Sequence, residues 1–256
     1  MSIVRQLRSA VKTQIVNTKI LKRPIIRYCI DNHLLPNLLA RTPSSVVREI
    51  FNLPYSEYET QLNQDIFALM MCRFRSGYFI EIGANDGFTL SNTVYLEEHF
   101  GWKGVLVEAN PKNAKSLARR KNSVVVNKAV SSKEGSAEFI DAGLFGGLKE
   151  SLDQTHRDKT KDAACITVEC LSLQSIMEVC ASPSRIDYVS IDVEGGELDI
   201  VEQMIKVNRR FSCGTIEHSW RMTEYHRMAE LLASANYKVI WSGQTEQDIF
   251  FIDEQI

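Results

Sequence analysis

Apolar and polar residues follow one another in blocks whose spacing predicts repeated strand and helix units. Runs such as "YFIEIG" and "GVLVEA" have the length and composition of buried strands. The blocks predict strands at 78–83, 104–108, 123–127, 186–191 and 213–217, and helices at 91–100, 112–120, 196–206 and 221–235. Because strands this apolar alternate with helices, we expect an α/β fold with a mainly parallel sheet covered on both faces.

The two ends of the chain depart from this alternation. Strands are predicted at 237–241 and 248–252, and only the short polar turn "SGQTEQ" separates them, which favours an antiparallel hairpin closing one edge of the sheet. A helical pattern within 57–75 leads into the first strand, and prolines break residues 1–55 into short helical pieces. We therefore divide the chain into a helical N-terminal extension, 1–70, and an α/β domain, 71–256.

The middle of the domain contains an insertion. Residues 131–184 hold two short strand-like runs, "SAEFI" and "CITVE", around a polar stretch that contains glycines. Long connections inside compact domains are commonly functional lids. We interpret about 141–165 as a lid-like insertion over the mouth of a substrate site.

Composition and charge fit one catalytic domain with a basic leader. The 256 residues are 44% hydrophobic and carry a net charge of −2. The first 50 residues hold nine Lys or Arg against two acids, with apolar residues between them. This segment predicts a peripheral membrane or protein contact, or else a solvated helix on the acidic body. Since the remainder is acidic and has no basic stripe, we expect no nucleic-acid partner.

Cysteine usage and targeting signals indicate a cytoplasmic protein. The cysteines are scattered without a CxxC pair, so we expect reduced thiols: Cys29, Cys72, Cys165, Cys170, Cys180 and Cys213. No apolar run approaches the roughly 20 residues of a membrane span. No stretch resembles a signal peptide.

A glycine turn and an acid mark a candidate nucleotide-type pocket. Gly83 and Gly87 follow the first strand of the sheet, where ligands of open parallel sheets bind, although such turns also use glycine for structural reasons alone. Glu108 ends the next strand, 21 positions after Gly87, where an acid commonly accepts ribose hydroxyls. The turn lacks GxGxxG and carries Asp86, which would repel a diphosphate. These features favour a cationic cofactor with a ribose.

Further acids end the two strands beyond the insertion. Asp192 and Glu194 lie in "SIDVEGGELDI", and Glu217 and His218 in "TIEHSW". The acids of the first motif have two explanations. They either cap the following helix and favour its dipole, which suits Glu197 well, or they take part in catalysis or metal binding. Asp192, Glu217 and His218 form a candidate ligand set for Mg or Mn. Alternatively, His218 is a general base without a metal, or only hydrogen-bonds the lid.

Three further features are weaker candidates. Trp220 follows the last parallel strand and is placed to stack on a sugar ring, although an aromatic there is more often core. His156 lies in the lid and is a candidate for contact with the substrate, although a histidine in a polar loop is usually solvated. A basic cluster (Arg157, Lys159 and Lys161) offers a contact for phosphate, but the intervening acids offset its charge.

Together these motifs resemble those of the FkbM family of S-adenosylmethionine-dependent methyltransferases. The likeness rests on "FIEIGANDGFTLSNTVYLEEHFGWKGVLVEANP", "NKAVSS" and "IDYVSIDVEGGELDIV" in that order. It runs from about residue 78 to residue 252 and leaves 1–70 outside. It implies a class I methyltransferase (Rossmann-like) fold with a seven-stranded sheet whose last strand is reversed.

The resemblance also implies roles for individual residues. By this likeness the methionine part and ribose of the cofactor are surrounded by Glu81, Gly83, Asn85 and Gly87. Glu108 holds the ribose hydroxyls, and the adenine lies near Asn127, Lys128 and Ala129. The acids after the fourth strand are similar to those of metal-dependent sugar O-methyltransferases, in which the second acid, here Glu194, is the general base. His218 replaces the acid usual in those enzymes.

The sequence is thus interpreted as a methyltransferase that moves a methyl group from S-adenosylmethionine to a hydroxyl oxygen. The expected acceptor is a sugar of a glycan or glycolipid. The alternatives are O- or N-methylation of a polyketide, lipid or other small molecule, and a non-catalytic cofactor-binding protein on the same fold. The sequence carries no signal for an oligomeric state.

Overall fold

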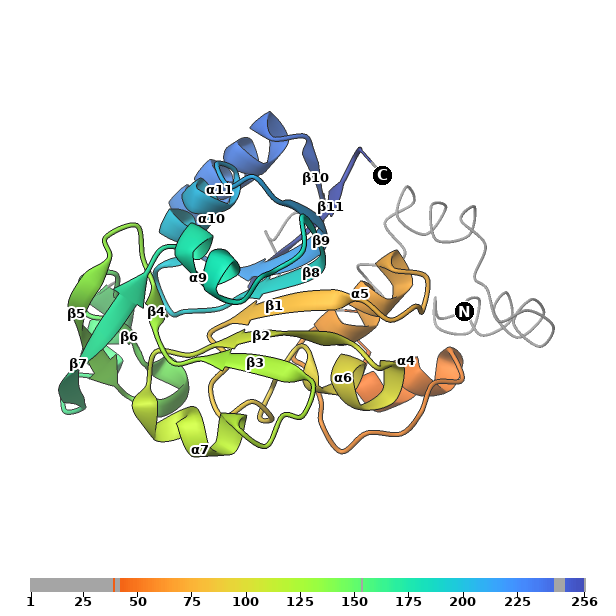
Figure 1. The fold of residues 1–256 in the computed structure, drawn as a ribbon, viewed down its shortest axis with the longest axis horizontal. Helices are drawn as coiled ribbons and strands as arrows, with labels where there is room; N and C mark the ends of the chain where they lie inside the picture. The colour runs from red at the N-terminus through yellow and green to blue at the C-terminus, as the bar shows by residue number, and fades with distance from the viewer. Residues whose placement is uncertain (1–38, 40–41, 153, 242–246, 256) are drawn as a thin grey trace.

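A seven-stranded sheet forms the centre of the computed structural model, which describes residues 39, 42–152, 154–241 and 247–255 (Figure 1). The order of the strands across the sheet is β10, β11, β9, β8, β1, β2, β3. Their bounds are β1 Tyr78–Ile82, β2 Lys103–Val107, β3 Ser123–Val126, β8 Arg185–Ile191, β9 Arg210–Glu217, β10 Tyr237–Trp241 and β11 Asp248–Asp253. Each strand predicted for this sheet is present, within a few residues of its expected bounds.

One strand runs against the others. β1, β2, β3, β8 and β9 pair in parallel, whereas β11 is antiparallel to both β9 and β10. The reversed last strand is therefore confirmed. β11 lies inside the sheet and β10 forms the edge, because β11 turns back and pairs with β9.

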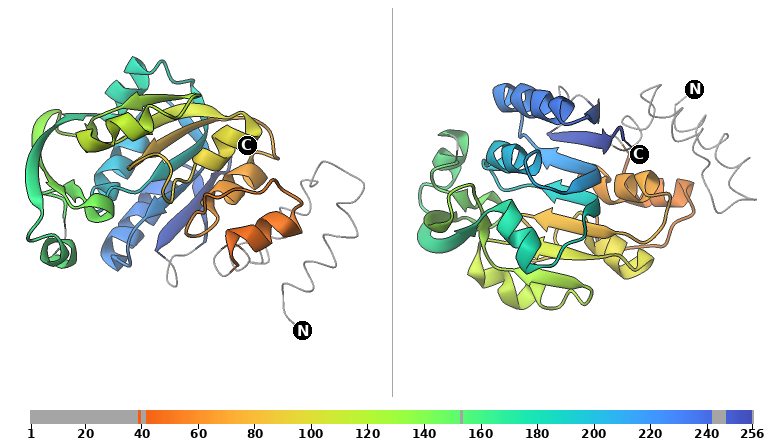
Figure 2. Two further views of the ribbon diagram at one scale, coloured as in Figure 1. Left: turned by 90° about the horizontal axis from the view of Figure 1, so that it is seen from below. Right: turned by 45° about the horizontal axis from the view of Figure 1, so that its top comes forward.

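Helices cover the sheet on both faces and build two cores (Figures 1 and 2). One layer contains α4 Ser44–Ile50, α5 Gln64–Met71, α6 Val94–Phe100 and α7 Ala114–Leu117, with the 3-10 helix η1 Pro111–Asn113 before α7. The other contains α9 Leu173–Val179, α10 Glu197–Met204 and α11 Met222–Ser234. Buried residues alternate along each central strand between the two cores, for example Phe79 toward α5 and Ile80 toward α9.

The described part of the predicted extension packs into the first of these cores. Val47 of α4 and Ile66 of α5 are fully buried there. Arg48 donates to Asp65 at 3.0 Å and to the Tyr58 carbonyl at 2.9 Å, so α4, the following loop and α5 are joined. The helix predicted within 57–75 is shorter, since the chain enters it through Asn63 in the left-handed conformation.

The insertion folds as a second, four-stranded sheet beside the first (Figure 1). The two strand-like runs are confirmed and pair antiparallel as β5 Gly135–Asp141 and β7 Ala164–Leu171. β4 Ala129–Val130 and β6 Gly147–Leu148 extend this sheet. The segment predicted as a lid lies between β5 and β7, and contains the 3-10 helix η2 Gly143–Phe145, β6 and α8 Gln154–Lys159.

A membrane-spanning helix is not found among the described residues, since none of their helices is both long and apolar enough. Most of the basic leader, residues 1–38, lies outside the described residues.

Candidate active site

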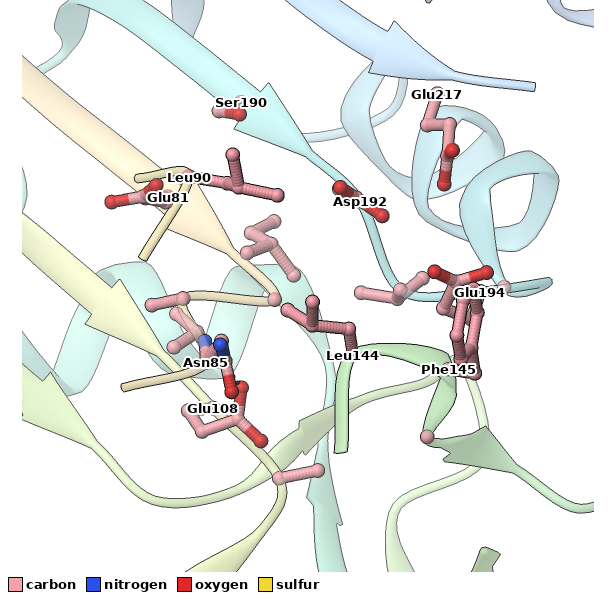
Figure 3. A pocket seen from close by; sticks show the side chains of 18 of the residues that line it. Glu81, Asn85, Leu90, Glu108, Leu144, Phe145, Ser190, Asp192, Glu194 and Glu217 are labelled. Carbon is pink, nitrogen blue, oxygen red and sulfur yellow. Dashed lines mark hydrogen bonds between the residues drawn. The ribbon is translucent and has the colours of Figure 1, made fainter. Parts of the chain in front are cut away.

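A pocket of about 570 Å³ opens at the carboxyl edge of the main sheet (Figure 3). One side is formed by the ends of β1 and β2, and the other by the ends of β8 and β9. The insertion closes the pocket from a third direction, with Leu144 and Phe145 at its wall. Pockets of this size at the carboxyl ends of parallel strands are typical ligand sites.

The turn after β1 lets two strand ends approach closely. At Gly83, φ is +87° and a Cβ atom would lie 1.6 Å from the carbonyl oxygen of Asp192, so only glycine fits. Gly83 and Asn85 line the pocket, as the sequence predicts for residues around the cofactor. The structure places Gly87 outside the lining residues, where a Cβ would meet Leu117 at 3.0 Å. Gly87 thus shapes the turn rather than the pocket wall.

Asp86, the acid of this turn, binds groups of the residues that directly follow it in the chain. Its carboxylate accepts hydrogen bonds from the backbone N–H groups of Phe88 (2.8 Å) and Thr89 (2.7 Å) and from the Thr89 hydroxyl. Asp86 is not one of the described residues that line the pocket. Its charge therefore stabilises the chain after the turn.

Glu81 is buried at the pocket floor and holds the loop before α6. Its carboxylate accepts from the Ser91 hydroxyl (3.0 Å), the Asn92 N–H (2.8 Å) and the Thr93 hydroxyl (2.5 Å). Burial raises the pKa of Glu81, and the nearby Arg120 and these hydrogen bonds oppose that rise. The side chain fixes residues 91–93, two of which line the pocket.

Glu108 joins the ends of β1 and β2 at the pocket wall. One carboxylate oxygen accepts from the Asn85 N–H and the other from the Asn110 N–H, both at 2.7 Å. Burial raises the pKa of Glu108, while the two backbone N–H groups favour its charged form. Carboxylate oxygens have further lone pairs, so Glu108 remains able to accept ligand hydroxyls.

Two of the three residues predicted to lie near the adenine line the same pocket as Glu108. Lys128 and Ala129 line it, and Lys128 forms an ion pair with Glu169 of β7. Asn127 does not line it; its amide donates to the carbonyls of Glu108 (2.8 Å) and Asn110 (3.2 Å) and so fixes the end of β2.

Three carboxylates converge on the other half of the pocket (Figure 3). Asp192, Glu194 and Glu217 each offer an oxygen, and these oxygens lie within 4.8 Å of one another. Glu217 Oε2 is buried and has no hydrogen-bond partner among the described residues. Burial and the Glu217 charge raise the pKa of Asp192 well above its usual range, and burial with the Glu217 charge raises the pKa of Glu194 to about 7. Such a cluster binds protons or a cation readily.

His218 is not brought into this cluster, although the sequence placed it there as a ligand and base. Its side chain is fully buried, its ring lies 5.1 Å from that of Tyr225, and it is not among the described residues lining the pocket. Neighbouring residues at the end of an extended strand point to opposite faces. Because Glu217 faces the pocket, His218 faces away, and Glu194 completes the set instead.

Glu197 lies in the first turn of α10, where an acid is favoured, but its side chain binds the preceding loop and does not cap the helix. Its carboxylate accepts from the N–H groups of Val193 (3.0 Å) and Gly195 (3.1 Å) and pairs with Arg221 at 2.5 Å. Asp192 and Glu194 are therefore left facing the pocket.

Three more residues complete the site: His156, which the sequence offered only as a weak candidate, and Asp248 and Gln64, which no sequence pattern singled out. His156 Nε2 of α8 lies 2.7 Å from Glu194 Oε2, although a lid histidine is usually solvated. Asp248, at the start of β11, pairs in register with Glu217, and burial raises its pKa to about 7. Gln64 of α5 donates to Asp248 at 3.0 Å. These contacts join segments far apart in the chain, so no local pattern signals them.

Fold and site together define the class of protein. The antiparallel strand β11 lies second from one edge of the sheet, and the pocket lies between a glycine turn and an acid at the end of β2. Both features are those of a class I, Rossmann-like methyltransferase. The family model described as "Methyltransferase FkbM domain" matches residues 81–239, which is more than half of the chain. The chain belongs to this family of S-adenosylmethionine-dependent methyltransferases.

Two solved structures with a similar arrangement are distant from this chain in sequence. An FkbM methyltransferase from Methylobacillus flagellatus KT is 13% identical, with a TM-score of 0.47, over 88% of this chain and 60% of that one. An O-methyltransferase from Bacillus cereus, solved in complex with SAH, is 15% identical, with a TM-score of 0.43, over 90% of this chain and 97% of that one. No curated protein matches the chain.

Proposed function

We propose that the protein transfers the methyl group of S-adenosylmethionine to a hydroxyl oxygen, on a sugar of a glycan or glycolipid. The observation that carries the proposal is the position of the three carboxylates, across one pocket from the turn and acid expected to hold the donor. Methyl transfer to oxygen needs the donor and acceptor aligned and the hydroxyl proton removed. The two halves of the pocket supply these two requirements.

The donor half suits a positively charged nucleoside without phosphates. Glu108 would accept the ribose hydroxyls, and the chain from Gly83 to Asn85 would border the methionine part. The missing side chain at Gly83 lets β1 and β8 approach closely, so that the two halves of the pocket lie side by side.

Glu194 is proposed as the base that receives the acceptor proton. As the acceptor oxygen bonds to the methyl carbon, the carbon–sulfur bond breaks with its electrons going to sulfur, and the hydroxyl proton passes to the carboxylate. A carboxyl with a pKa of about 7 is suited to this step near neutral pH. His156 would hold Glu194 in place through their 2.7 Å contact.

The donor site is tested by calorimetry of the purified protein with S-adenosylmethionine. We expect Glu108→Ala to weaken binding by about a hundredfold, because it removes the acceptor for the ribose hydroxyls. Val179→Ala, an exposed change on α9 away from the pocket, is the control. An affinity unchanged by Glu108→Ala would overturn the donor assignment.

Glycosides methylated by the wild type would then be fragmented in a mass spectrometer to locate the methyl group. Methylated nitrogen, or products only from polyketides or lipids, would favour those acceptors instead. Donor binding without any methylated product would favour a non-catalytic binding protein.

We further propose that the three carboxylates bind a divalent cation. Asp192, Glu194 and Glu217 present only hard oxygen donors, which suit Mg or Mn, and the buried, unpartnered Glu217 Oε2 fits such a role. A cation there would lower the pKa of the acceptor hydroxyl. We expect Mn²⁺ titrated into chelator-treated protein to bind, and Glu217→Gln to weaken it at least about tenfold. If Mn²⁺ does not bind, the proposal that remains is Glu194 as a base without a metal.

For location and partners, we propose a cytoplasmic enzyme without a nucleic-acid partner. The basic leader would contact a membrane surface or another protein, as its charge pattern predicts. Vesicle co-sedimentation with neutral and anionic lipids tests the first possibility, and equal sedimentation with both would count against it.

A further inference from the structure

Exposed apolar side chains are concentrated at the mouth of the pocket. Among the described residues, four of the seven large apolar side chains that stand exposed also line this pocket. They are Leu90 (40% exposed), Leu144 (48%), Phe145 (47%) and Trp220 (56%). Single exposed apolar residues are ordinary, but several around one opening mark a binding surface.

These four side chains reach the mouth from three separate segments. Leu90 comes from the loop between β1 and α6, Leu144 and Phe145 from η2 of the insertion, and Trp220 from the turn between β9 and α11. All four side chains line the same pocket as Glu108 and the carboxylate cluster, and in the view of Figure 3 Leu144 is drawn between these two groups. The apolar mouth is therefore continuous with the acceptor half of the pocket.

The turn that carries Trp220 is held in an unfavourable conformation. Ser219 and Trp220 have φ of 44° and 57°, in the left-handed region that non-glycine residues rarely adopt. Backbone hydrogen bonds fix it, from Ser219 N–H to the Gln247 carbonyl (3.2 Å) and from Arg221 N–H to the His218 carbonyl (2.7 Å). Strained turns of this kind cluster at ligand sites.

Charges around the acceptor half disfavour an anionic acceptor. Asp192, Glu194 and Glu217 meet there. Of the basic residues that line it, Arg221 pairs through Nη2 with Glu197 at 2.5 Å, whereas its buried Nη1 has no hydrogen-bond partner among the described residues. Lys159 Nζ lies 5.2 Å from the centre of the Phe145 ring. A phosphate or carboxylate near the reacting hydroxyl would be repelled by those of the three carboxylates that are ionised.

We infer that Trp220 and Phe145 form the acceptor subsite and select an uncharged sugar ring, an inference that rests on the proposed function. A pyranose ring has apolar C–H faces and hydroxyls at its edges. Its face would pack on the aromatic side chains, while its edge hydroxyls face the carboxylates. Aromatic side chains supply large, rigid contact surfaces for such a ring.

The test is saturation-transfer NMR with methyl glucoside and methyl galactoside as neutral probes, and glucose 6-phosphate as the charged comparison. The protein is first saturated with S-adenosylhomocysteine, whose own binding is measured by calorimetry. We expect both neutral probes to give signals and the phosphate to give none. Trp220→Ala and Phe145→Ala should each weaken binding of the neutral probes about fivefold or more, without changing the affinity for S-adenosylhomocysteine.

Two variants serve as matched controls. Trp220→Phe keeps an aromatic face and should retain most of the signal, and Val179→Ala removes an exposed apolar side chain elsewhere. Unchanged signals in both alanine variants, no signal from either glycoside, or a stronger signal from the phosphate would each overturn the inference and leave the donor site standing. Failure of S-adenosylhomocysteine to bind would overturn the proposed function, and this inference with it.

Discussion

At the scale of single residues, the direction of each side chain decides which acids belong to the site. Asp192 and Glu194 are two positions apart and both face the pocket, whereas the adjacent Glu217 and His218 face opposite ways. Glu194 itself has φ of 59°, a conformation that places its carboxylate beside His156. The sequence gives the positions of these acids, but the set that meets is decided by the path of the chain after β8.

Replacing Glu194 should separate the chemical step from donor binding. Glu194→Gln keeps the size of the side chain but removes the proposed proton acceptor, so methyl transfer should fall about 10²- to 10³-fold. The affinity for S-adenosylmethionine should stay within about threefold, because Glu194 lies away from Glu108. Rates and affinities are measured on the same preparations. Activity within about fivefold of wild type would exclude Glu194 as the base.

At the scale of elements, an ion-pair cluster holds the reversed strand in the sheet. Asp253 at the end of β11 pairs with Arg210 at the start of β9 (2.5 Å) and with Arg185 at the start of β8 (3.4 Å). Burial alone would raise the pKa of Asp253, but hydrogen bonds from Arg210 and the Gln255 N–H, with the Arg210 charge, outweigh it and lower the pKa. The cluster stabilises the pairing that places Asp248 opposite Glu217.

This lowered pKa gives a pH-dependent stability. The charged form of Asp253 is favoured in the folded state, so its contribution is present above the pKa of the unfolded chain and is lost as the pH falls through the folded pKa. Asp253→Asn should cost about 1–2 kcal/mol at pH 7 and less in acid. Urea unfolding at several pH values measures this, with the exposed Asp162→Asn as control. A difference independent of pH would contradict the assignment.

At the scale of the whole molecule, the N-terminal part and the insertion both contribute to the site. α4 and α5 pack in the same core as Phe79 and Tyr188 of the central strands. Through Gln64 and Asp248 this packing reaches the carboxylate cluster, and Gln61 lines the pocket. The insertion supplies His156 and the apolar wall from the opposite side.

The buried ion pair between Arg48 and Asp65 joins the N-terminal part to the domain, and its contribution to stability can be measured. Arg48→Met leaves Asp65 buried without its cation and should destabilise the protein by about 3–5 kcal/mol. Adding Asp65→Asn should recover part of the loss, because the remaining group is neutral and keeps its hydrogen bonds. Thermal and urea unfolding of the two single variants and the double variant give the coupling free energy between Arg48 and Asp65. An unfolding free energy of Arg48→Met equal to that of wild type would show that the contact is dispensable.

Sequence alone determined the fold class, the order of the strands along the chain, the reversed last strand, and the acids at the strand ends. The strands and the acids follow from local periodicity and from the rule that ligands bind at the carboxyl edge of a parallel sheet. The reversed last strand is what the resemblance to the FkbM family implies, and the short turn "SGQTEQ" agrees with it. Only the tertiary structure decided that Glu194 rather than His218 joins Asp192 and Glu217, and that His156 and Asp248 approach them. Those contacts depend on sheet register and on the docking of the insertion, which bring together residues distant in the chain and are therefore absent from any local pattern.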